Sequence, residues 1–311
     1  MTHTLVIDTS YGSTVGVVGH EPIVETDSRT HVERLQVNIG RAVDEAGLKP
    51  NDIDRIVVGI GPAPFTGLRA GVVAAKALAF ATGAQLLGQD ILAVQDRMMR
   101  LWRAGDESLR DCPFLATVAT SESTASAHHL TLAVNDARRR QLYFALYDDK
   151  ATDGDVSNTD APLIPMDIDY PAHIAERVTE AVQSLNQADD GASYVIDVVG
   201  HGAEKYAEQW QALGADLGSI IDASALDAGS AGLEMFMDCA LASAKSGERN
   251  GQNVSQSSDE KLTDEEFAAK AIKANGPVEP LYLRRPDVSV PNPLKHVLNH
   301  DGATKAAEGR R

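Results

Sequence analysis

The feature that most constrains the fold is a change in the spacing of apolar residues near residue 30. The runs "LVIDTS" and "STVGVVG" have the length and composition of buried strands, and the short turn "YG" between them predicts a hairpin. A third strand is expected at "PIVETDSR". From Thr30 onward the apolar residues recur about every 3.6 residues, which indicates an amphipathic helix. Thr30 can cap this helix, and Gly47 and Pro50 can end it.

Strands and helices continue to alternate along the rest of the chain. A strand at "DRIVVGIG" leads into a helix over about 66–83, and Asp90 can cap another helix at "DILAVQDRMMRLW". Further on, "LTLAVND" and "QLYFALYD" repeat the opening hairpin pattern, which indicates an α/β protein with two lobes. We expect a first lobe at 1–111, a second lobe at 112–287 with polar insertions near 119–130 and 246–265, and a flexible tail at 288–311.

Composition limits the classes of function. The chain has 311 residues and a formal net charge of −17, with 45 acids against 28 bases, which disfavours a chain that binds a nucleic-acid backbone by itself. Two distant cysteines make neither a disulfide framework nor zinc spacing. The N-terminus does not have the pattern of a signal peptide, and the most apolar segment contains Lys76 among many alanines and glycines. We therefore expect a cytoplasmic protein with no membrane partner.

The stretch "GIGPAPFTGLRAG" at 59–71 has the form of a strand, a glycine turn and a helix start. The free N–H groups of such a helix start can bind an anion. The stretch matches neither the Walker pattern nor G-x-G-x-x-G, and Pro62 and Pro64 remove two N–H donors. From the residues alone, a structural turn and an anion site both remain open.

The helix after this stretch is apolar on more than one side, so something must cover it. Together with the amphipathic helix before it, it predicts a surface for a protein partner. The residues that we predict to contact the partner are Val32, Leu35, Ile39, Val43, Leu68, Arg69, Val72, Ala75 and Leu78.

Four segments carry a resemblance to a known family. "LVIDTS", "GIGPAPFTGLRAG", "NDARRRQLYFALYD" and "VEPLYLRR" occur in order, and together they resemble the bacterial TsaB (YeaZ) family over residues 4–149 and 194–287. The resemblance implies a two-lobed actin-like, sugar-kinase-like (ribonuclease H-like) fold, with a mixed sheet and flanking helices in each lobe. It also implies a role in the machinery that attaches threonylcarbamoyl to the adenosine next to the tRNA anticodon.

The family implies specific partners. These are a catalytic paralogue, TsaD, which binds a metal through a His-x-x-x-His pair, and an ATPase subunit, TsaE. Pairing with TsaD, and with a second copy of the same chain, uses the helices of the first lobe, and tRNA is bound only through the complex. The chain is thus expected to be a non-catalytic scaffold, the pseudo-enzyme subunit of a transferase complex.

The residues fit a subunit without its own metal or catalytic group. His31 is followed four residues later by Leu35, so the metal-binding pair of TsaD is incomplete. No H-E-x-x-H is present, which disfavours the metalloprotease implied by the older glycoprotease label. Ala63 and Pro64 stand where the family usually has glycine and serine, a change that stiffens the loop.

An actin-like nucleotide site would need two facing hairpins that carry aspartates, and a glycine turn. The candidates are Asp8, Thr9, Asp136, Gly200 and Gly202. An ATP-dependent enzyme, either an ATPase or a carbamoyl transferase, is therefore the alternative hypothesis, and a direct tRNA-binding module is a third. Arg138, Arg139 and Arg140 suit either a phosphate contact or a solvated turn. For the scaffold we expect no cofactor on this chain alone, with ATP and Mg²⁺ in the assembled complex.

Overall fold

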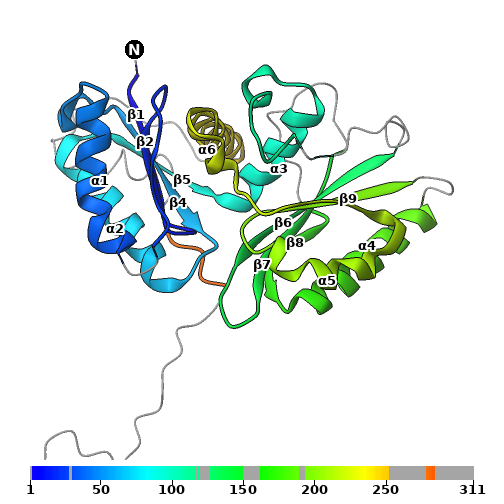
Figure 1. Cartoon of the computed structure of the whole chain (residues 1–311). Coiled ribbons are helices and arrows are strands. Elements are labelled where there is room, and N and C mark those ends of the chain that lie inside the picture. The colour runs from blue at the N-terminus through cyan, green and yellow to red at the C-terminus, as the bar shows by residue number, and fades with distance from the viewer. Residues whose placement is uncertain are drawn as a thin grey trace, which may run out of the picture.

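The computed structural model describes residues 2–27, 30–116, 118, 127–149, 162–188, 193–251 and 278–283. These residues form two lobes, each built on a five-stranded mixed sheet (Figure 1). The predicted fold class, two mixed sheets with flanking helices, is confirmed.

The first sheet has the order β3-β2-β1-β4-β5. Its first three strands form an antiparallel meander, while β4 and β5 run parallel to β1. The parallel strands need helical crossovers, which α1 and α2 supply on one face of the sheet. The elements are β1 (Thr4–Asp8), β2 (Ser13–Val17), β3 (Ile23–Glu25), α1 (His31–Glu45), β4 (Arg55–Gly61), α2 (Phe65–Thr82) and β5 (Gln85–Asp90).

The second sheet has the order β10-β9-β6-β7-β8 and repeats the connectivity of the first. Its strands β6, β7 and β8 form the antiparallel meander, and β9 and β10 continue parallel to β6. The predicted repeat of the opening hairpin is thus confirmed. The elements are α3 (Ile91–Arg103), β6 (His128–Asp136), β7 (Leu142–Asp148), β8 (Ile164–Asp169), α4 (Pro171–Ala188), β9 (Tyr194–Val199), α5 (Ala207–Trp210), β10 (Leu217–Ile221) and α6 (Ser230–Gly251).

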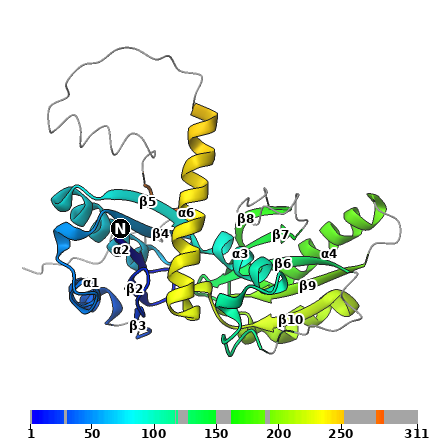
Figure 2. The same ribbon diagram turned by 90° about the horizontal axis from the view of Figure 1, so that it is seen from above.

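A shared core joins the lobes. Alternate residues of each strand face opposite sides, so Val6 points toward the second lobe while Leu5 and Ile7 pack under α1 and α2. The helices α3 and α6 fill the space between the two sheets, and Met98 and Phe236 belong to the same buried cluster as Val6. Figure 2 shows α6 running between the lobes. Because both sheets pack on these two helices, the lobes are not independent bodies.

Two predicted boundaries need correction. The insertion expected near 119–130 overlaps β6, which begins at His128, because His128 and His129 pair with β9 in parallel register. The insertion expected at 246–265 overlaps α6, which continues to Gly251 because a formed helix extends readily by one residue at a time. Residues 119–126 and 252–265, and the tail at 288–311, lie outside the described residues.

A buried ionic cluster fixes α3 to the second sheet. Arg100 Nε donates to Asp96 Oδ2 at 2.7 Å, and Arg103 donates to Asp149 at 2.8 Å and to Asp197 at 2.7 Å. Burial raises the pKa of Asp96 from 3.8 to about 6, although the charge of Arg100 opposes this. In Asp197 burial also acts to raise the pKa, but a contact from His129 and the charge of Arg103 outweigh it and lower the pKa.

Asp96 predicts a pH dependence of stability. Its pKa is higher in the folded than in the unfolded chain, so its contribution is fully present below about pH 4 and is lost as the pH rises through about 6. The substitution Asp96→Asn removes this loss. The free energy of unfolding of the variant, relative to the unsubstituted chain, should rise by about 3 kcal/mol between pH 4 and 7 in urea titrations. A difference for Asp96→Asn that stays flat over this pH range would contradict the prediction.

Candidate functional site: the interlobe cleft and the outer face of α2

The loop 61–64, which precedes α2, is bound to the second lobe. Asn135, at the end of β6, donates from Nδ2 to the carbonyl oxygens of Pro62 at 3.0 Å and Ser10 at 3.3 Å. The hydroxyl of Tyr143 on β7 donates to the carbonyl oxygen of Ala63 at 3.2 Å. We call these three hydrogen bonds the interlobe clasp. The loop thus presents carbonyl oxygens rather than N–H groups, which favours the structural turn over the anion site.

Two glycines let β4 and α2 approach the end of β1 closely. A Cβ at Gly59 on β4 would overlap the carboxylate of Asp8. A Cβ at Gly71 would lie 2.5 Å from Oγ1 of Thr9, so only glycine allows α2 to sit this close to the end of β1. Gly71 therefore serves packing.

A small cavity lies between the lobes. Its lining includes Asp8 and Tyr11 from the first lobe and Asn135, His201 and Asp227 from the second. Its volume of about 20 Å³ holds about one water molecule. Sites for small molecules usually measure roughly 300–1,000 Å³. The cavity in this conformation is therefore much smaller than a typical small-molecule site.

A stacked pair of rings spans the cleft. Tyr11, in the turn between β1 and β2, stacks on His201, which follows β9, with ring centroids 3.9 Å apart and planes inclined by 20°. His201 Nε2 lies 3.3 Å from Oδ2 of Asp227, so an acid on the same lobe orients the imidazole. The stack thus brings the turn between β1 and β2 of the first lobe into contact with the segment that follows β9 in the second lobe.

Asp8 is held by its own turn. Its carboxylate accepts from the backbone N–H of Ser10 at 3.0 Å and from the hydroxyl of Ser10 at 2.8 Å. Burial raises the pKa of Asp8, while the two hydrogen bonds from Ser10 act in the opposite direction. Among the described residues, no group of three or more His, Cys, Asp or Glu side chains is placed to hold a metal ion.

The other four nucleotide candidates do not join Asp8 in the cavity. Asp136 pairs with Nζ of Lys205 at 3.1 Å and accepts from the N–H of Arg138 at 2.8 Å. Gly202 N donates to the carboxylate of Asp222 at 2.7 Å. A Cβ at Gly200 would overlap the carbonyl oxygen of Val134, and Thr9 is covered by α2. Each of these residues thus has a local packing or turn-forming contact.

Six of the predicted partner contacts are wrong. Leu35, Ile39, Val43, Leu68, Val72 and Ala75 are each at most 7 % exposed and form the core between the first sheet and its two helices. The most regular apolar stripe of an amphipathic helix faces its own sheet, which is the physical reason. Of the remaining three, Val32 and Leu78 are half-buried and Arg69 is exposed.

The exposed side of α2 carries a different apolar stripe. Thr66, Arg69, Val73, Ala77 and Phe80 are exposed and lie three or four residues apart, so they share one face. The side chains of Val73 and Phe80 are 61 % and 82 % exposed. We call these five residues the outer face of α2. The signal that could have found it is present in the sequence, because α2 is apolar nearly all round and therefore has a second apolar side.

The segment 278–283 is fixed to the start of α2. Val278 is buried in the first-lobe core, and Leu281 N donates to the carbonyl oxygen of Ile60 at 2.8 Å. Lys76 pairs with Glu279 at 2.9 Å, and the ring of Phe65 lies 5.1 Å from that of Tyr282. The "VEPLYL" segment, which is distant from the first lobe in the sequence, thus packs on the first lobe and on α2.

The interlobe clasp gives a testable prediction. Asn135→Ala leaves the carbonyl oxygens of Pro62 and Ser10 without their buried donor, which should lower the free energy of unfolding by about 2 kcal/mol in urea titrations. Tyr143→Phe removes one donor and should cost about 1 kcal/mol. The exposed Asn51→Ala is the control and should stay within about 0.5 kcal/mol. Equal stabilities for all three variants would show that the clasp contributes nothing.

Comparison with known proteins gives partial matches. A family model described as "TsaD: tRNA N6-adenosine threonylcarbamoyltransferase" matches residues 17–104, a stretch that contains α1 and α2. The uncharacterized protein Rv3421c of Mycobacterium tuberculosis is 35 % identical over 152 residues, which cover 47 % of this chain and 59 % of that protein. The match thus spans about three fifths of that relative's length.

Two further similarities bear on the fold and the family. A tRNA N6-adenosine threonylcarbamoyltransferase of Cereibacter sphaeroides is 44 % identical over 71 residues, which cover 23 % of this chain and 20 % of that enzyme. The structure of YeaZ from Pseudomonas aeruginosa matches with a TM-score of 0.51 and 21 % identity, over 91 % of this chain and all of that one. The latter match shows the two-lobed fold. Together these similarities agree with the resemblance to the TsaB (YeaZ) family.

Proposed function

We propose that this chain is a scaffold of the TsaB (YeaZ) kind, a non-catalytic subunit that pairs with a TsaD-like catalytic subunit in the synthesis of tRNA threonylcarbamoyladenosine. The fold shared with YeaZ and the family match over residues 17–104 support a place in the tRNA threonylcarbamoyladenosine family. The pairing itself is the finer part of the proposal, and it rests on the outer face of α2.

The exposed apolar side chains of α2 carry this proposal. A phenylalanine that is 82 % exposed gains about 1.5–3 kcal/mol when a partner buries it. Val73 and Ala77 extend the same face, and aromatic side chains of this kind are frequent binding hot spots. Arg69 lies 5.0 Å over the ring of Phe65 at one end of the helix and supplies a polar rim.

A protein fits this face better than a lipid bilayer does. The helix is long and apolar enough by composition to span a membrane, but a third of it is buried inside the first lobe. The burial of Leu68 and Ala75 against the sheet fixes the helix as part of a folded domain. The matched TsaD model covers the same two helices, so two paralogues would meet through related surfaces, and so would two copies of this chain.

The cleft supports a subunit without its own nucleotide. The cavity between the lobes measures only about 20 Å³, and Tyr11 stacks on His201 across the cleft. We propose that ATP and Mg²⁺ are supplied by the partners, including a TsaE-like ATPase, and that the complex works in the cytoplasm. ATP turnover by the purified chain, abolished by Asp8→Asn, would instead favour the ATP-dependent enzyme.

Phe80→Asp tests the pairing. A charge placed in the buried interface should weaken the complex with a TsaD-like subunit at least about 30-fold, measured by size exclusion with light scattering and by titration calorimetry. The variant's own stability should change by less than about 0.5 kcal/mol, because Phe80 is exposed in the free chain.

The matched control is Tyr170→Asp, which changes an exposed aromatic residue on the second lobe. It should assemble like the unsubstituted chain. Normal assembly of Phe80→Asp would rule out the outer face of α2 as the interface. Loss of the homodimer alone would assign this face to a second copy of the chain instead.

A further inference from the structure

The turn between β6 and β7 carries three consecutive arginines in an uncommon backbone conformation. Arg138, Arg139 and Arg140 have φ angles of 64°, 53° and 64°, all in the left-handed region, and all three are exposed. Residues other than glycine enter this region at a cost of about 1 kcal/mol each or more. Glycine or asparagine would form such a turn more easily, so the turn itself does not account for the presence of arginine.

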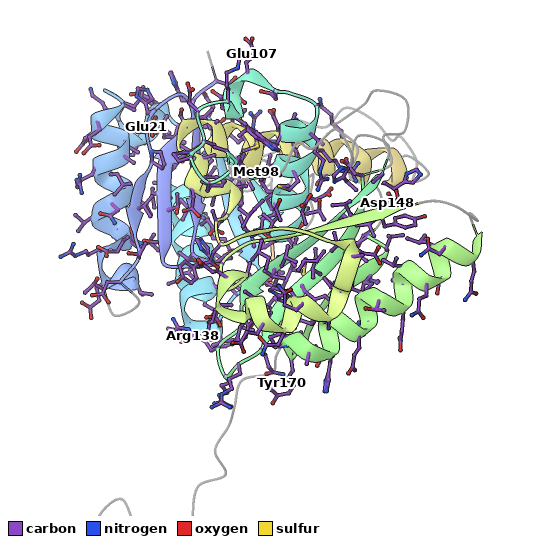
Figure 3. The ribbon with its side chains drawn as sticks, turned by 45° about the vertical axis from the view of Figure 1, so that its right-hand side comes forward. Glu21, Met98, Glu107, Arg138, Asp148 and Tyr170 are labelled. Atoms are coloured by element: carbon purple, nitrogen blue, oxygen red, sulfur yellow. The ribbon has the colours of Figure 1, made fainter. Side chains whose placement is uncertain are left out.

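The structure around the turn holds this conformation in place. Ala137 N donates to the carbonyl oxygen of Gln141 at 3.1 Å, and Gln141 N donates to that of Arg138 at 3.1 Å. Ala137 and Leu142, on either side, are buried. The base of the turn is therefore fixed, and the three arginines at its tip are exposed. Figure 3 shows Arg138 at the rim of the molecule.

Positive charge is concentrated at this tip. The nearest acid in the sequence, Asp136, is already paired with Lys205 at 3.1 Å, which adds a fourth cation to the neighbourhood. Within the part of the chain that the structure describes, neither Arg138 nor Arg140 forms an ion pair with a carboxylate. Such a cluster stands out on a chain with a net charge of −17.

The tip does not belong to the interlobe cavity. None of the three arginines lines it, so the phosphates of a nucleotide in the cleft are not what they would contact. The hairpin that carries the tip is, however, hydrogen-bonded to the loop that precedes α2. Asn135 and Tyr143, at the base of the same hairpin, form the interlobe clasp to the loop that starts α2.

We infer that the turn 137–141 binds the phosphate backbone of RNA. Guanidinium groups form bidentate, charge-assisted hydrogen bonds to phosphate oxygens, and three on a narrow hairpin can follow successive phosphates along a strand. Contacts of this kind position an RNA without reading its sequence. The choice of RNA over an acidic protein surface rests on the proposed function in tRNA modification. The tip then adds a tRNA contact from the scaffold itself to the contacts made by its partners.

The test measures binding of fluorescently labelled unmodified tRNA by anisotropy. It uses the full chain, alone and together with a TsaD-like subunit, over a range of salt concentrations. The triple substitution Arg138→Gln, Arg139→Gln and Arg140→Gln should weaken binding at least about tenfold at low salt and reduce the slope of log K against log salt by about 2. The change Arg→Lys at all three positions should keep most of the salt slope but lose affinity, because lysine lacks the planar fork.

A second triple variant controls for net charge. Arg34→Gln, Arg41→Gln and Arg110→Gln remove three arginines whose side chains are 64 %, 56 % and 69 % exposed elsewhere. This variant should bind tRNA within about twofold of the unsubstituted chain. Equal losses in both triple variants, unchanged binding by the first, or no salt-dependent tRNA binding in either setting would overturn the inference. If the Gln variant of the tip loses binding to an acidic polypeptide but keeps its binding to tRNA, the tip is a protein-binding site.

Light scattering on the same samples separates this inference from the proposed function. The Gln variant of the tip should still pair with the TsaD-like subunit, because the outer face of α2 is unchanged. If the unsubstituted chain forms no such pair but its tRNA binding depends on the tip, the pairing is wrong and the RNA contact stands. If pairing occurs and the Gln variant of the tip binds tRNA like the unsubstituted chain, the pairing stands and the RNA contact is wrong.

Discussion

The buried amide of Asn135 is the contact on which the arrangement of the lobes depends. It is 1 % exposed, and it joins the end of β6 to the carbonyl oxygens of Ser10 and Pro62 in the other lobe. The partners of this amide follow β1 and precede α2, so one side chain bonds both segments to the second lobe. The amide adds to the packing of both sheets on α3 and α6, and a buried donor without these acceptors would be costly.

The two lobes repeat one connectivity, yet their equivalent aspartates have diverged. Asp8 ends β1, is buried, and is satisfied by Ser10, whereas Asp136 ends β6 and pairs with Lys205 beside the arginine turn. Here one acid is held by its own turn and the other pairs with Lys205, while Tyr11 stacks on His201 across the cleft.

The wrong partner residues have one physical cause. Helical spacing identifies Leu35, Leu68 and Val72 correctly as apolar positions, but it cannot tell a core from an interface, because both bury the same kinds of side chain. Val73 and Phe80 lie off that stripe and are not found by it. The strand at His128 also escapes prediction, since its polar residues are held by pairing with β9 and not by their own β-propensity.

The sequence by itself determined the opening strands, the repeated hairpin, the helices α1, α2 and α3, the cap at Asp90 and the turn at 61–64, because hydrophobic period and glycine or proline geometry act over a few residues. It did not identify the strands β5, β8 and β10. Only the tertiary structure decided which side of α2 stays exposed, that Tyr11 closes the cleft on His201, and that the arginine turn lies outside it. These outcomes depend on contacts between distant residues, such as the 73 positions that separate Asn135 from Pro62. Local periodicity carries no information about pairs so far apart, whereas the packing of two sheets on α3 and α6 fixes them.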